Sequence, residues 1–242
     1  MQLWKSWVIA TKDFSVFRKK KRILYSLIIL PLLLSIGLPV ILRFIARTAQ
    51  PAEIAVLLGA FSFFYIVLTY IVSSPLAAYS ILGEKIEQSM EPLLATPTTD
   101  GELLLGKTIA TFLPSVGVIY ISAVIFMVLS DLFTYNEINY LFFPNWIFAF
   151  ILLLVVPLAT ILSIQLNVII SSRVNDVRTA NQIAFLLFIP FFVLYVSLEA
   201  NLVSLNIINL LVIFATLILI DLVLFFISKA LFRRDEILTK WK

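Results

Sequence analysis

The sequence contains no cysteine and no histidine, and only 13% of its 242 residues are charged. Without these two residue types the chain can form no disulfide, thiol nucleophile, histidine base or ordinary zinc site. Apolar residues make up 62% of the chain and the mean hydropathy is +1.07. A soluble domain has about 45–50% apolar and about 25% charged residues. The composition therefore predicts a membrane protein.

Six segments are long and apolar enough to cross a bilayer, which takes about 20 residues. They lack the alternation of a membrane barrel, so we expect an all-α membrane protein with a single domain over residues 1–242. Pro75, Pro157 and Pro190 fall inside segments and are expected to bend them. The expected spans are residues 23–42, 54–82, 103–129, 144–170, 182–198 and 207–231.

The distribution of basic residues predicts the orientation. If the N-terminus is inside, 16 of the 18 Lys and Arg residues fall on the cytoplasmic side, and only Arg43 and Arg47 lie outside. An excess of Lys and Arg in cytoplasmic loops is typical of membrane proteins. We therefore expect a multi-pass protein of the plasma membrane with both termini in the cytoplasm.

Residues 1–22 are expected to form an interfacial helix followed by a basic anchor. Trp4, Trp7, Val8 and Phe14 share one helical face, and the basic run 18–22 abuts the first span. This pattern is typical of an amphipathic helix that lies in the membrane interface. The alternative is a solvated helix packed on another subunit.

Residues 83–102 form the longest polar interval and are expected to be a cytoplasmic coupling segment. Gly83 is expected to end the second span, and apolar residues then recur at three- and four-residue spacing opposite an acidic side, as in a short amphipathic helix. Residues 96–101 are expected to form a turn, and Glu102 to start the third span. An acidic segment with an apolar face suits a groove on a basic cytoplasmic partner, although a solvated connector is the alternative.

Residues 84–97 (EKIEQSMEPLLATP), followed by residues 102–107 (ELLLGK), resemble the signature of the ABC type-2 exporter permeases. The departures are Ile86, Gln88 and Ser89. The resemblance implies a permease that pairs with a second copy or a homologue and with cytoplasmic ABC ATP-binding subunits. It also implies that no cofactor binds this chain, because ATP and magnesium belong to the partner. The coupling contacts that the resemblance implies are the acidic Glu84, Glu87 and Glu91 and the apolar Leu93 and Leu94.

Residues 101–108 (GELLLGKT) formally match a phosphate-binding loop. That loop requires a preceding strand, whereas here no strand is expected and a membrane span follows. We therefore interpret Lys107 as an interfacial anchor and Gly106 as a close-packing position. We expect no catalytic or metal-binding residues, and no enzyme activity, on this chain.

Asp221 lies near the middle of the sixth expected span. A carboxylate at that depth costs at least about 2.5–3.5 kcal/mol, so a polar partner is expected, and Gln165 and Asn167 are the candidates. Asp221 could line a transport pathway, or it could fix helix packing.

The expected function is the permease subunit of an ATP-driven exporter, forming the translocation pathway as a dimer within the lipid bilayer. The alternatives are an ATP-independent secondary transporter or channel, an enzyme acting on lipid, and a membrane anchor for a soluble partner. A secondary transporter would show several ionisable residues or broken helices at the midplane, and a lipid enzyme would need an acid–base or metal constellation. Nucleic acid is not an expected partner.

Overall fold

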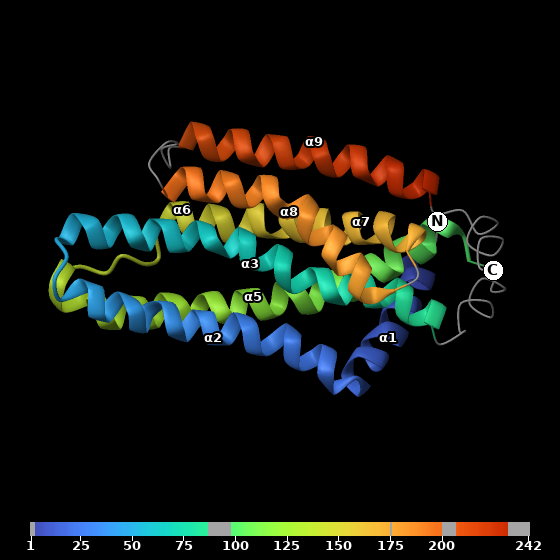
Figure 1. The fold of residues 1–242 in the computed structure, drawn as a ribbon, viewed down its shortest axis with the longest axis horizontal. Helices are drawn as coiled ribbons and strands as arrows, with labels where there is room; N and C mark the ends of the chain where they lie inside the picture. Colours follow the sequence, from blue (N-terminus) through green and yellow to red (C-terminus); the bar gives the residue numbers. More distant parts are fainter. Residues whose placement is uncertain (1–2, 87–97, 175, 200–206, 232–242) are drawn as a thin grey trace.

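The computed structural model describes residues 3–86, 98–174, 176–199 and 207–231. Within these ranges the regular secondary structure is entirely helical, and the long helices run side by side in a bundle (Figure 1). The first half consists of α1 (Leu3–Lys19), α2 (Lys21–Ala46), α3 (Pro51–Ile86) and α5 (Asp100–Ile138). The second half consists of α6 (Trp146–Phe150), the π-helix η1 (Ile151–Val155), α7 (Val156–Arg173), α8 (Val177–Glu199) and α9 (Ile207–Leu231). The expected all-α fold is confirmed.

Five helical segments in the described residues are long and apolar enough to cross a membrane, which makes the chain a multi-pass membrane protein. They are Leu27–Ala46, Pro51–Glu84, Gly101–Ile138, Trp146–Arg173 and Ile207–Ser228, and each overlaps one expected span. The remaining expected span, residues 182–198, lies within α8, which packs against α3 and α7. The helix is confirmed there, and the count of six spans stays a prediction.

Two expected boundaries around the polar segment are wrong. Gly83 does not end a span, because α3 continues through it to Ile86. A Cβ at this position would lie 2.9 Å from the ring of Tyr79, so the glycine makes room for that ring. Residues 100 and 101 do not belong to a turn, because α5 begins at Asp100.

A capping box explains where α5 begins. The side chain of Thr99 accepts a hydrogen bond from the backbone N–H of Glu102, and the Glu102 carboxylate accepts one from the N–H of Thr99. This reciprocal pair satisfies two backbone donors that a helix start otherwise leaves unpaired. The helix runs nine residues beyond the expected end at residue 129 and stops at Asn139, which has a left-handed φ of 61°.

The fourth span starts with α6 and changes helix type before Pro157. Asn145 caps α6 by accepting a hydrogen bond from the N–H of Phe148 at 2.8 Å. The chain then takes one π-helical stretch, η1, and returns to α geometry with a proline in the first turn of α7. Pro157 has no N–H to donate, and the departure from α geometry lies directly before it. By contrast, α3 and α8 continue as helices through Pro75 and Pro190.

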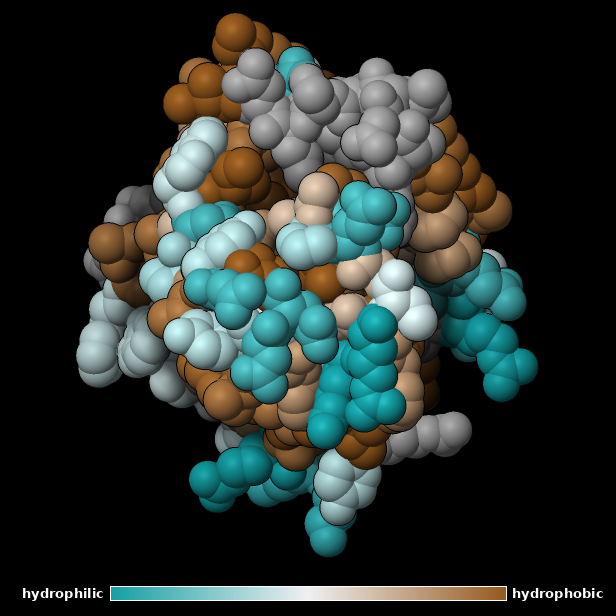
Figure 2. Space-filling view, turned by 90° about the vertical axis from the view of Figure 1, so that its left-hand side faces the viewer, coloured by the Kyte–Doolittle hydropathy of each residue, from teal (hydrophilic) through white to brown (hydrophobic). Residues whose placement is uncertain are grey.

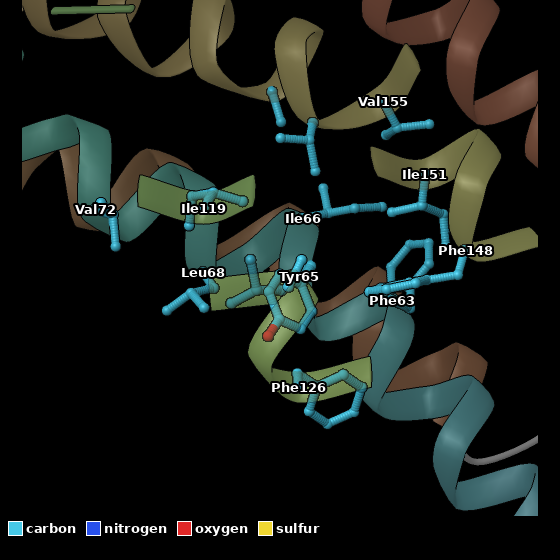
Figure 3. Close-up of a cluster of buried hydrophobic side chains, with 14 of the residues drawn as sticks. Phe63, Tyr65, Ile66, Leu68, Val72, Ile119, Phe126, Phe148, Ile151 and Val155 are labelled. Atoms are coloured by element: carbon cyan, nitrogen blue, oxygen red, sulfur yellow. The ribbon is translucent and has the colours of Figure 1, made fainter. Parts of the chain in front are cut away.

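Aromatic side chains form the centre of the core (Figure 3). The ring of Tyr65 on α3 lies 5.5 Å from the rings of both Phe126 on α5 and Phe148 on α6. The Tyr65 hydroxyl donates to the carbonyl of Ser122 at 3.2 Å and lies 2.9 Å from Ser35 Oγ on α2. The buried phenol therefore has polar partners on two other helices, which is what a buried tyrosine requires.

The two ends of the bundle differ from its sides. Figure 2 looks onto the end where α2 turns into α3 and α5 connects to α6, and hydrophilic residues gather across it while hydrophobic ones surround it. The opposite end carries α1, the end of α3, the start of α5 and the turn from α7 to α8 (Figure 1). All the described pieces that the basic residues predict to be cytoplasmic thus lie at one end.

Candidate functional site: a buried ion cluster beside the coupling segment

The N-terminal helix α1 packs against α5 with a side that mixes polar, small and apolar residues. Its buried positions are Ser6, Ile9, Ala10, Asp13 and Phe17. Four apolar residues near its start face away from the protein: Leu3 and Trp4 are each 74% exposed, and Trp7 and Val8 are about half exposed. An amphipathic helix in the membrane interface would present its apolar side to lipid in this way. The interfacial position of α1 stays a prediction.

Gly106 allows α1 to approach the backbone of α5. A Cβ at Gly106 would lie 2.8 Å from both Ile9 Cβ and the carbonyl oxygen of Ser6. One turn earlier, Ser6 Oγ donates a hydrogen bond to the carbonyl of Glu102 at 3.0 Å. The prediction that Gly106 is a close-packing position is confirmed.

Lys107 lies at the centre of a buried ion cluster that joins three helices. Its side chain is only 1% exposed, and its Nζ lies 2.6 Å from Glu84 Oε2 on α3 and 3.6 Å from Asp13 Oδ2 on α1. It also donates a hydrogen bond to the carbonyl of Ser80 on α3. Our interpretation of Lys107 as an interfacial anchor is therefore wrong, because its ammonium group is buried inside the protein.

Two further contacts complete the ion cluster. Lys12 Nζ on α1 lies 2.9 Å from Glu84 Oε1, and Ser80 Oγ donates to Asp13 Oδ2 at 3.0 Å. The ion cluster, defined as Lys12, Asp13, Glu84 and Lys107, thus contains two cations and two anions. Charges taken out of water are tolerated when they are paired and hydrogen-bonded. The balance of charge explains how so apolar a chain keeps Asp13, Glu84 and Lys107 buried, while Lys12 remains partly exposed.

The pKa of Asp13 is shifted by its position in the ion cluster. Burial raises the pKa of Asp13 above its ordinary value of 3.8, and the negative charge of Glu84 acts in the same direction. The ammonium groups of Lys107 and Lys12 and the hydrogen bond from Ser80 oppose that rise. Burial is the largest of these effects, and the net pKa is raised.

The ion cluster lies at the root of the predicted coupling segment. Glu84 is two residues before the end of α3, and α5 begins at Asp100 with Lys107 two turns further on. Glu84 itself is 9% exposed and holds one lysine on each carboxylate oxygen. The other predicted coupling contacts, Glu87, Glu91, Leu93 and Leu94, lie outside the described residues. The contact of these five residues with a partner stays a prediction.

The segment that resembles a phosphate-binding loop is helical. Residues 101–108 form the first turns of α5, so no loop surrounds a phosphate there. The lysine of the motif, Lys107, is already paired with the carboxylates of Glu84 and Asp13. The interpretation of this segment as a helix start is confirmed.

Asn167 on α7 takes part in a polar contact between helices, but not with Asp221. Its side-chain amide donates to Ser74 Oγ on α3 at 3.0 Å and to the carbonyl of Ser163 at 2.8 Å. Ser163 Oγ in turn donates to the carbonyl of Tyr70 at 3.1 Å. These hydrogen bonds join α3 to α7, which is a frequent role of small polar residues in membrane helices.

Asp221 is buried without a hydrogen-bond partner among the described residues. Its exposed fraction is 7%, and neither carboxylate oxygen accepts a hydrogen bond in that part of the chain. Gln165 Oε1 is likewise buried without a partner there. The expectation that Gln165 and Asn167 pair with Asp221 is therefore wrong for this structure, because Asn167 turns toward α3 instead.

Sequence reasoning missed the ion cluster, although parts of it had a signal. Thr99 and Glu102 have the spacing of a capping box, which would have placed the start of α5 correctly. Asp13 lies on the helical face that carries Ser6 and Ala10, opposite the tryptophans. The pairing itself had no signal, because Asp13, Glu84 and Lys107 are distant in the sequence.

Comparison with known proteins agrees with the helical membrane architecture. The family described as "ABC-2 family transporter protein" matches residues 7–211 of the chain. A search of curated proteins gave no match. The family match includes α1 from residue 7 onward, the ion cluster, the predicted coupling segment and the first residues of α9.

Proposed function

Because the chain belongs to the ABC-2 family of transporter proteins, we propose that it is the permease subunit of an ATP-driven exporter. In this proposal the chain forms the pathway and carries no catalytic residue. ATP and magnesium bind a separate cytoplasmic ABC subunit. A second permease, identical or homologous, completes the transporter in the plasma membrane. In this proposal the spans within residues 1–242 line one side of the pathway.

The observation that supports this proposal best is the position of the ion cluster. Segment 87–97 is joined to α3 on one side and to α5 on the other, and Glu84 and Lys107 bind each other across these two helices at 2.6 Å. Asp13 and Lys12 add α1 to the same cluster. A partner that displaces the segment would therefore move three helices together. Paired buried charges suit this role, because separating them is costly.

The proposal divides the coupling residues into two groups. Glu87, Glu91, Leu93 and Leu94 would contact the ATP-binding subunit, with the acids facing its basic residues. Glu84 was included in that set from the sequence, but its carboxylate is engaged by Lys107 and Lys12. We therefore assign Glu84 to force transmission and not to recognition of the partner.

The orientation is also part of the proposal. The end that carries α1 and the α7–α8 turn would face the cytoplasm, since 16 of the 18 basic residues belong to that side. Asp221 would lie within the membrane, where it either lines the pathway or meets a polar group of the second permease.

The test is a charge reversal in the coupling segment of the full chain, coexpressed with its ABC subunit. Glu87→Lys with Glu91→Lys should abolish copurification of the ATPase and ATP-dependent transport, because the acidic contacts are lost. The matched control is Glu53→Lys with Glu137→Lys, which reverses two exposed acids at the opposite end. Transport that continues without ATP, or an ATPase that stays bound to the reversed segment, would refute the proposal.

A further inference from the structure

Two hollows lie in succession along α5, toward the end of the bundle opposite α1, and the consecutive residues Met127 and Val128 line one each. The first has a volume of about 280 Å³ and lies between α5 and the α6–η1 region. The second has a volume of about 550 Å³ and lies between the last turns of α5 and residue 141. We call the two together the α5 groove.

The two parts of the α5 groove differ in chemistry. The first part is apolar, with Val124, Ala149 and Leu153 exposed along it. Its floor is held by Tyr120, whose hydroxyl donates to the carbonyl of Leu152 at 3.0 Å. The second part combines apolar side chains with three polar ones, Asp131, Tyr135 and Asn136. One end of the groove therefore suits a hydrocarbon chain and the other a polar headgroup.

The position of the groove across the membrane agrees with an apolar part and a polar part. Lys107 and Asp131 are separated by about 36 Å along α5, at 1.5 Å per residue. The hydrocarbon core of a bilayer is about 30 Å thick. When the level of the buried ion cluster is set at one boundary of the hydrocarbon, Asp131 reaches the headgroup region of the opposite leaflet, while Val124 remains within the hydrocarbon.

Asp131 determines the charge of the headgroup that fits. Among the described residues that line the two hollows it is the sole charged one, and no Lys or Arg of that part of the chain forms an ion pair with it. Its carboxylate accepts hydrogen bonds from the N–H groups of Phe142 at 3.1 Å and Phe143 at 3.2 Å. A carboxylate has about four acceptor positions, so the Asp131 carboxylate can still accept hydrogen bonds from an ammonium group. Tyr135 and Asn136 can donate to a phosphate.

We propose that the α5 groove binds a phospholipid with a primary ammonium headgroup from the leaflet opposite α1. One acyl chain lies along Val124 and Leu153, the ammonium group meets Asp131, and the phosphate meets Tyr135 or Asn136. This inference goes beyond the exporter function and does not depend on the ATP-binding subunit.

The experiment uses the full chain in vesicles of phosphatidylethanolamine and phosphatidylglycerol, each in turn carrying a photoreactive diazirine in one acyl chain. After illumination, mass spectrometry locates the lipid adducts on the protein. We expect the phosphatidylethanolamine adducts to concentrate on α5 and η1 around Val124 and Leu153. Adducts spread evenly over all lipid-facing helices would overturn the proposal.

Two substitutions on neighbouring residues test the groove itself. Val124→Trp fills it and should lower the phosphatidylethanolamine adduct about tenfold, the effect of about 1.4 kcal/mol of lost binding energy. Ile121→Trp is the control, because Ile121 is 61% exposed on the same helix but does not line the groove. An equal loss in both variants, or in neither, would overturn the proposal.

Asp131→Asn tests the headgroup. It should remove the preference for phosphatidylethanolamine over phosphatidylglycerol, a change of about threefold for one partly exposed charge pair. Asp131 also accepts hydrogen bonds from the N–H groups of Phe142 and Phe143, so its replacement could change the groove itself. The total amount of lipid adduct is therefore measured together with the preference between the two lipids. A preference that survives in Asp131→Asn, with total labelling unchanged, would refute the assignment of the ammonium group to Asp131.

Discussion

Lys107 and Glu84 form an ion pair of 2.6 Å in which the lysine side chain is 1% exposed and the glutamate side chain 11% exposed. The two residues belong to α3 and α5, the helices on either side of residues 87–97. Their contact is therefore a direct link between the two ends of that segment, and it can be tested apart from any partner.

Replacing Lys107 should destabilise the protein strongly. Lys107→Met would leave Glu84 and Asp13 without their buried cation, and breaking a buried pair in this way costs about 3–5 kcal/mol. The measurement is thermal unfolding of the purified chain in detergent, followed by helical circular dichroism. Lys12→Met is the control, because Lys12 is 43% exposed and an exposed pair contributes about 0–1 kcal/mol. Equal losses in the two variants would contradict a buried pair at Lys107.

A double substitution separates the ion pair from general packing effects. If Lys107 and Glu84 stabilise each other, Lys107→Met combined with Glu84→Gln should cost less than the sum of the two single changes. Residues in contact commonly show such coupling, by about 0.5–3 kcal/mol. Strict additivity would indicate that the two side chains act independently.

Adding one methyl group at Gly106 should loosen the contact between α1 and α5. The new Cβ would lie 2.8 Å from Ile9 Cβ and from the backbone oxygen of Ser6, and overpacking costs about 1–3 kcal/mol. The same thermal measurement applies to Gly106→Ala. Gly117→Ala is the control on the same helix, because nothing lies within 4 Å of its added Cβ, and alanine there should stabilise by up to about 1 kcal/mol. Matching stability in the two variants would contradict the close approach of α1.

Asp13 should give the protein a pH dependence of definite sign. Its pKa is raised in the folded state, so the folded protein holds this proton more tightly than the unfolded chain. The stability from Asp13 is fully present below 3.8, the ordinary pKa, and is lost as the pH rises from there to the raised value. The measurement is the unfolding temperature of the wild type and of Asp13→Asn from pH 3 upward. As the pH rises, the unfolding temperature of the wild type should fall relative to that of Asp13→Asn.

Asp176 provides a control of opposite sign for the pH experiment. Hydrogen bonds from the backbone and side chain of Thr179 lower the pKa of Asp176. Its contribution is therefore present above 3.8 and is lost as the pH falls through the lowered value. Asp176→Asn and Asp13→Asn should shift the stability profile in opposite directions, and a common direction would contradict the effect of burial on Asp13.

Replacing the intramembrane acid should stabilise the isolated chain. A buried polar group without a partner costs about 1–3 kcal/mol, so Asp221→Leu should raise the unfolding temperature in detergent. Asn167→Leu is the contrasting variant, because it removes hydrogen bonds to Ser74 and Ser163, which are worth about 1 kcal/mol in membrane proteins. A lower unfolding temperature for Asp221→Leu would show that the carboxyl group has a stabilising partner in the protein.

The overall arrangement could be predicted from the sequence because hydropathy and length act locally. Residues 207–231 were predicted as a span and form α9 with the same bounds. The amphipathic pattern of residues 1–22 likewise predicted α1 and identified Trp4 and Trp7 as members of its outward face. In each of these cases the physical cause, burial in lipid or in the protein, is visible in a single stretch of chain.

The errors lie where distant helices meet. Gly83 is a helix breaker by propensity, but the packing of Tyr79 and the ion pair of Glu84 keep α3 helical to Ile86. Asp221 and Asn167 were paired because both are polar at membrane depth. Asn167 instead faces α3, because the rotation of α7 about its axis is set by packing and not by its composition.

By itself, the sequence determined that this protein is a helical membrane protein with most of its basic residues on one side and an acidic segment between two spans. These properties follow from the free energy of transfer into lipid, which depends on each segment alone. Only the tertiary structure decided that Glu84 is held by Lys107 and Lys12 and that α1 rests on Gly106. Those contacts join residues far apart in the chain, and which charges meet depends on how the helices rotate and cross.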